Sequence, residues 1–239
     1  MILRRVTEHV KAQNWFAVGI DFLIVVVGVF IGIQVANWNE ARVQDSRDRV
    51  LLDRLHADFE RIVAWGEDNV PKIEDLPVQT KRMIDIIRSD VEPELDDAFR
   101  TMAAATVEVW SGAELSPTYE ELVATGTLSR IRSRELRRAL SNYARQRESA
   151  YILLDRQLAI RDTGAMEEAI RFQTSDDDYE ATKIAESFHW IALKATEPHL
   201  QIVLRNQVLR ARWQRRTFES ASNVLRLLKD AEAYRAVEP

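Results

Sequence analysis

The sequence predicts an all-α protein in which one N-terminal transmembrane helix continues into a soluble helical bundle. Three observations support this fold class. Residues 15–38 form a long apolar run. The 239-residue chain has only 7 Gly and 6 Pro, too few for the many turns of an all-β fold. Beyond the run, apolar residues recur at helical spacing, and no strand alternation or internal repeat is predicted.

Composition restricts the possible functions. The chain is 46% hydrophobic and 30% charged, so most of it is expected to fold in water. Its net charge of -5 comes from interleaved acids and bases, which argues against a nucleic-acid partner. The absence of cysteine excludes disulfides, thiol nucleophiles and iron–sulfur ligation. We expect no cofactor.

Three parts are predicted along the chain. Residues 1–14 form a basic interfacial segment, because Ile2, Leu3, Val6 and Val10 share one helical face. Residues 15–38 form the transmembrane helix, which is longer than the ~20 residues that cross a ~30 Å hydrocarbon core. Residues 39–239 form the helical bundle.

Tryptophans bracket the predicted span and indicate its ends. Trp15 and Trp38 stand where aromatic side chains anchor a helix at the two membrane interfaces. A cleaved signal peptide is the alternative. It would need small residues at the last and third-last positions, and the ends at Gly32, Ala36 and Ala41 each fail this test. We therefore predict an uncleaved signal-anchor.

One face of the span carries small residues. Gly28, Gly32 and Ala36 are spaced by four, and small residues let two helix backbones approach closely in lipid. This face predicts self-association, or docking to the span of another membrane protein. A face of glycines directed at lipid is the alternative.

Asp21 lies about 20° from the centre of this face at ~100° per residue. Two interpretations follow. In the first, Asp21 is an acid near the membrane interface that reaches water. In the second, it is a functional intramembrane carboxylate. Its short distance from Trp15 favours the first.

Orientation follows from the basic residues around the span. Arg4, Arg5 and Lys11 precede it, and four arginines follow it closely, so the positive-inside count is balanced. The short basic start favours a cytoplasmic N-terminus, with the bundle on the other side.

The bundle helices follow from periodicity and caps. The helix of the span is predicted to continue and to end near Gly66 to Pro71. Amphipathic segments follow around Met83–Ile87 and around Phe99 and Met102. Ser116 is predicted to cap a helix that starts at Pro117 and ends before Gly126, and Ser133 to cap a long one. "QTSDDDYE" (173–180) is predicted to be a polar connection, and Pro198 to open a last long helix.

Two segments carry a family resemblance. "GIDFLIVVVGVFIGIQVANWNEAR" and the later "SPTYEELVATGTLSRIRSRELRRALSNY" resemble a bacterial family of single-span membrane proteins of unknown function. The shared signatures are Asn-Trp-Asn-Glu, here Asn37–Glu40, and Thr-Tyr-x-Glu-Leu-x-x-x-Gly, here Thr118–Gly126. The resemblance implies a helical domain behind one inner-membrane anchor, an acid at position 21, commonly Glu, and no particular activity. It leaves the last 70 or so residues unplaced.

Other groups with possible chemistry have simpler explanations. His56, Glu60 and Asp53 lie one turn apart and fit a solvated helix face better than a metal site. Asp176, Asp177 and Asp178 lack the spacing of a calcium loop. "RARWQRR" (210–216) could bind nucleic acid or lipid headgroups, but a solvated helix stripe is favoured.

We therefore expect a membrane-anchored interaction or assembly module and not an enzyme. It would be oligomeric or an accessory subunit of a larger envelope complex. The alternative is a partner subunit of a proton-driven stator-like complex that uses Asp21. An unrecognised enzyme is the third possibility.

Overall fold

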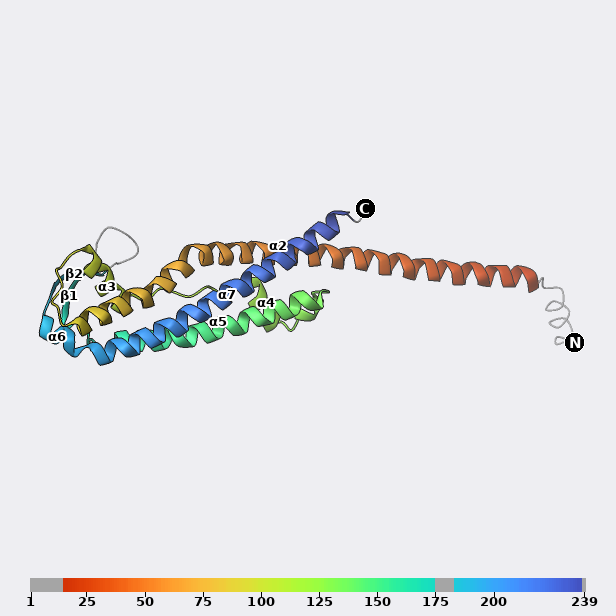
Figure 1. Cartoon of the computed structure of the whole chain (residues 1–239). Coiled ribbons are helices and arrows are strands. Elements are labelled where there is room, and N and C mark those ends of the chain that lie inside the picture. The colour runs from red at the N-terminus through yellow and green to blue at the C-terminus, as the bar shows by residue number, and fades with distance from the viewer. Residues whose placement is uncertain (1–14, 175–182, 238–239) are drawn as a thin grey trace, which may run out of the picture. The chain divides into compact units, whose positions relative to one another are not determined.

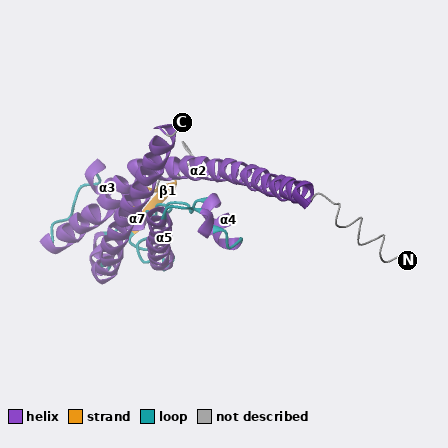
Figure 2. Ribbon diagram, turned by 90° about the vertical axis from the view of Figure 1, so that its right-hand side faces the viewer, coloured by secondary structure: helices purple, strands orange, loops and turns teal. Residues whose placement is uncertain are grey.

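A computed structural model describes residues 15–174 and 183–237 of the chain, with side chains for 19–174 and 183–230. The predicted interfacial segment 1–14 and Asp176–Asp178 lie outside the described residues, as does the side chain of Trp15. The chain divides into two compact units, Met1–Leu51 and Leu52–Pro239. Helices dominate both, and Figure 2 shows the short strands among them. The predicted all-α class is confirmed.

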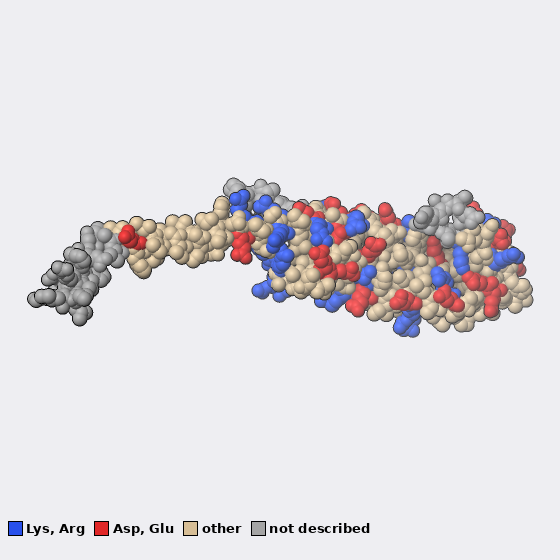
Figure 3. Space-filling model, turned by 180° about the vertical axis from the view of Figure 1, so that it is seen from behind, with Lys and Arg blue, Asp and Glu red and all other residues tan. Residues whose placement is uncertain are grey.

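Helix α2 runs from Trp15 to Ser89 and therefore belongs to both units. Its N-terminal part is long and apolar enough to cross a membrane, and the most apolar stretch buries none of its residues. Phe22 and Leu23, for example, are 71% and 60% exposed. Figure 3 shows this stretch almost free of charged residues. In the unit Leu52–Pro239, which we call the folded unit, acids and bases are interspersed over the visible face.

The predicted end of this helix near Gly66 to Pro71 is wrong. The helix continues through Pro71 and Pro77 to Ser89, and Figure 1 shows it bending on the way, as proline-containing helices do. Gly66 is required by packing, because a Cβ there would lie 2.3 Å from Cδ2 of Phe218. The helix stops where Asp90 adopts a positive φ of 56°, just before Pro93.

The capping signals are confirmed for two helices. In α4 (Pro117–Ala124) the Ser116 side chain accepts a hydrogen bond from the Tyr119 amide, and Pro117 occupies the first turn. In α5 (Arg134–Arg161) Ser133 accepts from the Leu136 amide. Asp96 caps α3 (Asp97–Val107) in the same way, and a 3-10 turn, η1 (Leu128–Arg130), joins α4 to α5.

A β-hairpin was not predicted. Strands β1 (Ile170–Thr174) and β2 (Lys183–Phe188) pair antiparallel, with an irregularity between Arg171 and Phe172. Part of the predicted polar connection, Gln173–Thr174, therefore belongs to a strand. The short helix α6 (Trp190–Ala195) follows.

The last long helix, α7 (Glu197–Val237), begins as predicted around Pro198 and lies beside α5 (Figure 1). Leu200, Ala211, Ala221, Leu225 and Leu228 are buried along it. At one end of the bundle, α2 and α7 meet α3, α6 and the hairpin around one apolar cluster. Its members include Met83, Ile84, Phe99, Met102, Ile170, Leu193 and Leu200.

Candidate functional site

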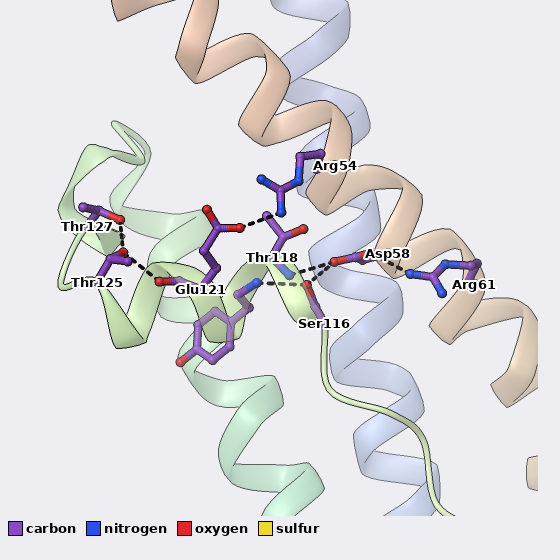
Figure 4. Close-up of polar contacts among 9 residues, drawn as sticks. Arg54, Asp58, Arg61, Ser116, Thr118, Glu121, Thr125 and Thr127 are labelled. Carbon is purple, nitrogen blue, oxygen red and sulfur yellow. Dashed lines mark hydrogen bonds and ion pairs between the residues drawn. The ribbon is translucent and has the colours of Figure 1, made fainter.

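Asp58 is the centre of a network of polar contacts between α2 and α4 in the folded unit (Figure 4). It lies on α2 with only 7% of its surface exposed. Its Oδ2 atom accepts hydrogen bonds from the Ser116 hydroxyl at 2.7 Å and from the Thr118 amide at 3.1 Å. Its Oδ1 atom accepts from Arg61 at 2.7 Å. One carboxylate on α2 thus binds the first turn of α4.

The charge of Asp58 is stabilised by these donors. Burial raises the pKa of the carboxyl, but the hydrogen bonds from Ser116, Thr118 and Arg61 together outweigh it, so the pKa lies below its ordinary value. The N-terminus of α4 also favours a negative charge at this point. Asp58 is therefore ionised at neutral pH.

A second contact between the same helices lies one turn earlier on α2. Arg54 donates to Glu121 at 2.6 Å, and this hydrogen bond raises the pKa of Arg54. About half of each side chain is exposed, so the pair contributes at most ~1 kcal/mol. It adds a second contact between α2 and α4.

The Thr118–Gly126 segment therefore has a structural explanation. Thr118, Tyr119 and Leu122 are buried, and Glu121 carries the contact to Arg54. Gly126 follows the helix with a positive φ of 68°, a conformation that glycine adopts without strain. Thr118, Tyr119, Glu121, Leu122 and Gly126 thus each serve the docking or the ending of α4.

The extended segment 108–115, which leads into α4, is held by side chains of α5. Tyr143 donates to the Glu114 carbonyl at 2.7 Å, Arg147 to that of Ala113 at 2.9 Å, and Tyr151 to that of Gly112 at 3.5 Å. These three donors are spaced by four along one face of α5. They satisfy carbonyls that have no strand partner.

A cleft of about 350 Å³ opens beside Asp58. We call it the Asp58 cleft; its lining combines aromatic, apolar and charged groups from α2, α4, α5 and the extended segment. Apart from Asp58, the lining residues are Arg61, Ile62, Trp65, Ser111, Gly112, Glu114, Leu115, Pro117 and Tyr151. Such a mixture suits the binding of a small molecule or a side chain of a partner.

Asp58 was not predicted from the sequence as a site residue, although its place among apolar helix positions is a signal. Asp58 falls between Leu55, Phe59 and Ile62, which are all buried. An acid on the apolar face of an amphipathic helix requires buried donors, because an unpaired buried charge is costly. The helix pattern alone does not indicate that Ser116 and Thr118 supply them.

The predicted span residues all lie in the unit Met1–Leu51. Asp21, Gly28, Gly32 and Ala36 are exposed in the single chain. A Cβ added at Gly28 or Gly32 would meet no atom within 4 Å. Trp38 is 64% exposed, and Arg42 lies 5.1 Å from its ring centroid.

The remaining candidate residues lie elsewhere. His56 and Glu60 are 3.4 Å apart. In the described ranges no three His, Cys, Asp or Glu side chains come together as metal ligands. The interpretation of residues 210–216 as a solvated stripe is wrong for Arg210, which is fully buried, while Arg215 pairs with Glu74.

Comparison with known proteins returned no match: no family model, no curated protein and no solved structure is similar to this chain.

Proposed function

We propose that the protein is a membrane-anchored assembly module of the bacterial inner membrane. In this proposal the Trp15–Trp38 segment crosses the bilayer once, with the N-terminus in the cytoplasm and the folded unit in the periplasm. The span binds a second copy of the chain or the span of another membrane protein. The folded unit presents the Asp58 cleft to the same assembly.

The observation that carries the proposal is the open face of the span. Gly28 and Gly32 lie on a continuous helix with no atom near the positions that a Cβ would take. In lipid, association depends on close backbone packing, which small residues permit. The apolar residues around the face are exposed in the single chain, as lipid contact requires.

Measuring association of the span tests the proposal. Gly28→Ile combined with Gly32→Ile should weaken association at least tenfold, because branched side chains block backbone approach. Gly19→Ile is the matched control: it makes the same change about 140° away from Gly32 on the helix.

The span should be measured alone in a membrane two-hybrid assay, and the full chain by sedimentation in detergent. The two formats are needed because contacts between folded units can mask a weakened span. An association constant that the double substitution leaves unchanged in both formats would refute the proposed interface.

A second candidate function rests on the position of Asp21. Its place about 20° from the centre of the glycine face would direct the carboxylate towards a packed partner helix. A carboxylate there could take up and release protons, as in the single-span subunit of a stator-like complex.

A further inference from the structure

The Asp58 cleft is lined by two opposite charges that do not pair with each other. Arg61 comes from α2 and Glu114 from the extended segment 108–115. Arg61 pairs with Asp58, and 67% of its side chain is exposed. The Glu114 carboxylate is exposed and forms no hydrogen bond or ion pair among the described residues. A guanidinium and a carboxylate therefore both remain accessible to a ligand in one cleft of about 350 Å³.

Asp58 holds Arg61 in place and leaves most of its hydrogen-bond donors unused (Figure 4). The contact to Oδ1 of Asp58 uses an Nη2 atom at 2.7 Å, and a guanidinium has five N–H donors in all. The Ser116 hydroxyl, the Thr118 amide and the N-terminus of α4 also stabilise this carboxylate. Arg61 therefore supplies only part of the compensating charge, and its remaining donors are available to an acceptor in the cleft.

The backbone around the cleft adds further donors. Carbonyls of the extended segment accept hydrogen bonds from side chains of α5. By contrast, the amides of its cleft residues donate to no acceptor among the described residues: Ser111, Gly112, Glu114 and Leu115. Backbone amides are rarely left without an acceptor, so water or a ligand supplies it. The cleft thus offers an excess of donors on the side of Glu114 as well as at Arg61.

The rest of the lining is apolar or aromatic, with side chains of Ile62, Trp65, Leu115, Pro117 and Tyr151. Arg147, which is not a lining residue, lies 4.2 Å from the centroid of the Tyr151 ring and covers one of its faces. We therefore expect Trp65 to provide the main aromatic surface for a ligand. The volume lies at the lower end of the range for small-molecule sites, which suits a ligand of the size of one amino acid.

The two charges decide between the possible ligands. A simple anion would bind Arg61 and the free amides, but it would leave Glu114 unpaired and be repelled by it. A simple cation would bind Glu114, but it would leave the donors without an acceptor. A zwitterion satisfies both groups. We propose that the Asp58 cleft binds a free α-amino acid with a large apolar side chain, its carboxylate on Arg61 and its ammonium group on Glu114. This ligand site goes beyond assembly and does not depend on how the span associates.

Three probes of similar shape separate the charges. L-Phenylalanine carries both, phenethylamine lacks the carboxylate, and 3-phenylpropionate lacks the ammonium group. Isothermal titration calorimetry of the full chain in mild detergent, with detergent alone as the blank, should give L-phenylalanine a Kd of ~1 mM or tighter. The two singly charged probes should bind at least fivefold more weakly. At about ten times its Kd, L-phenylalanine should also raise the midpoint of thermal unfolding by about 4 °C.

Matched variants assign each charge. Arg61→Gln should weaken L-phenylalanine at least fivefold and leave phenethylamine unchanged, because only the amino acid presents a carboxylate. Glu114→Gln should weaken L-phenylalanine to a similar extent and leave 3-phenylpropionate unchanged. Arg82→Gln and Glu92→Gln, at exposed positions outside the cleft lining, are the controls and should alter the binding of none of the probes.

The proposal is overturned if the wild type does not bind L-phenylalanine in this range, or binds a singly charged probe equally well. Equal weakening of all three probes in Arg61→Gln and Glu114→Gln also overturns it, because these side chains would then support the cleft without binding the ligand. The readout is ligand binding and not association of the chain. Each of these results therefore leaves the span interface of the proposed function intact.

Discussion

Replacing Asp58 by alanine is the substitution with the largest expected effect on the folded unit. The change removes the acceptor for two buried donors, the Ser116 hydroxyl and the Thr118 amide, whose residues are 0% and 2% exposed. Leaving one buried donor without a partner costs ~1–3 kcal/mol. Removing the buried carboxylate also removes its burial penalty, which offsets part of the cost of the two unpaired donors. We therefore expect the free energy of unfolding to fall by about 3 kcal/mol.

Thermal unfolding of the full chain in detergent, followed by circular dichroism, measures this loss. At ~2–4 °C per kcal/mol for a domain of this size, the midpoint should fall by about 9 °C. Asp75→Ala is the control. It removes an exposed acid of the same helix whose hydrogen bonds within the described residues all go to Gln79 one turn away, and it should change stability by less than ~0.5 kcal/mol.

Hydrogen exchange locates the change. In Asp58→Ala the amides of α4 should lose protection before those of α5 and α7, because the lost hydrogen bonds hold only α4. Equal stability losses for Asp58→Ala and Asp75→Ala, with α4 still protected, would refute the assignment of Asp58 as the attachment point of α4.

The pH dependence of stability has a defined sign. Because the pKa of Asp58 is lowered in the folded protein, its contribution to the stability of the fold is complete above the ordinary carboxyl pKa of 3.8. The contribution is lost as pH falls through the folded pKa. The difference in stability between wild type and Asp58→Ala should therefore shrink below about pH 4.

Three further substitutions test other parts of the account. Gly66→Ala should destabilise the folded unit by ~1–3 kcal/mol, because the new methyl meets Phe218, and adding Phe218→Leu should restore part of the loss in the same unfolding assay. Asp21→Asn should preserve membrane insertion and complementation of a deletion strain; loss with Asn and rescue with Asp21→Glu, at equal protein levels, would instead favour proton handling. A cysteine in place of Asp97, whose side chain is fully exposed, should react with an impermeant maleimide on intact spheroplasts, and labelling only after lysis would reverse the orientation.

Local signals in the sequence predicted the helices well. Ser116, Pro117 and Ser133 indicate helix starts because a cap depends only on the few amides that follow it. The end of α2 was wrong because Gly66 and Pro71 were interpreted as stops. Packing against Phe218 explains Gly66, and the surrounding bundle maintains the helix through both prolines.

Contacts between residues far apart in the chain could not be predicted from the sequence. The alternation in Ile170–Gln173 is a strand signal, but four residues are too few to distinguish it from a loop. The burial of Arg210 and the link from Asp58 to Ser116 depend on residues 53 and 58 positions away, so no local pattern indicates them.

Disulfide crosslinking within the span tests the central claim most directly. The chain has no cysteine, so single cysteines can be placed at Ala36, on the glycine face, and at Gln34, about 160° away on the helix. After mild oxidation of native membranes, Ala36→Cys should form a covalent dimer, because two copies packed on this face bring their cysteines together, whereas Gln34→Cys should remain monomeric. No dimer at Ala36, or equal crosslinking at both positions, would contradict the proposal that the Gly28, Gly32 and Ala36 face packs against a second copy of the chain.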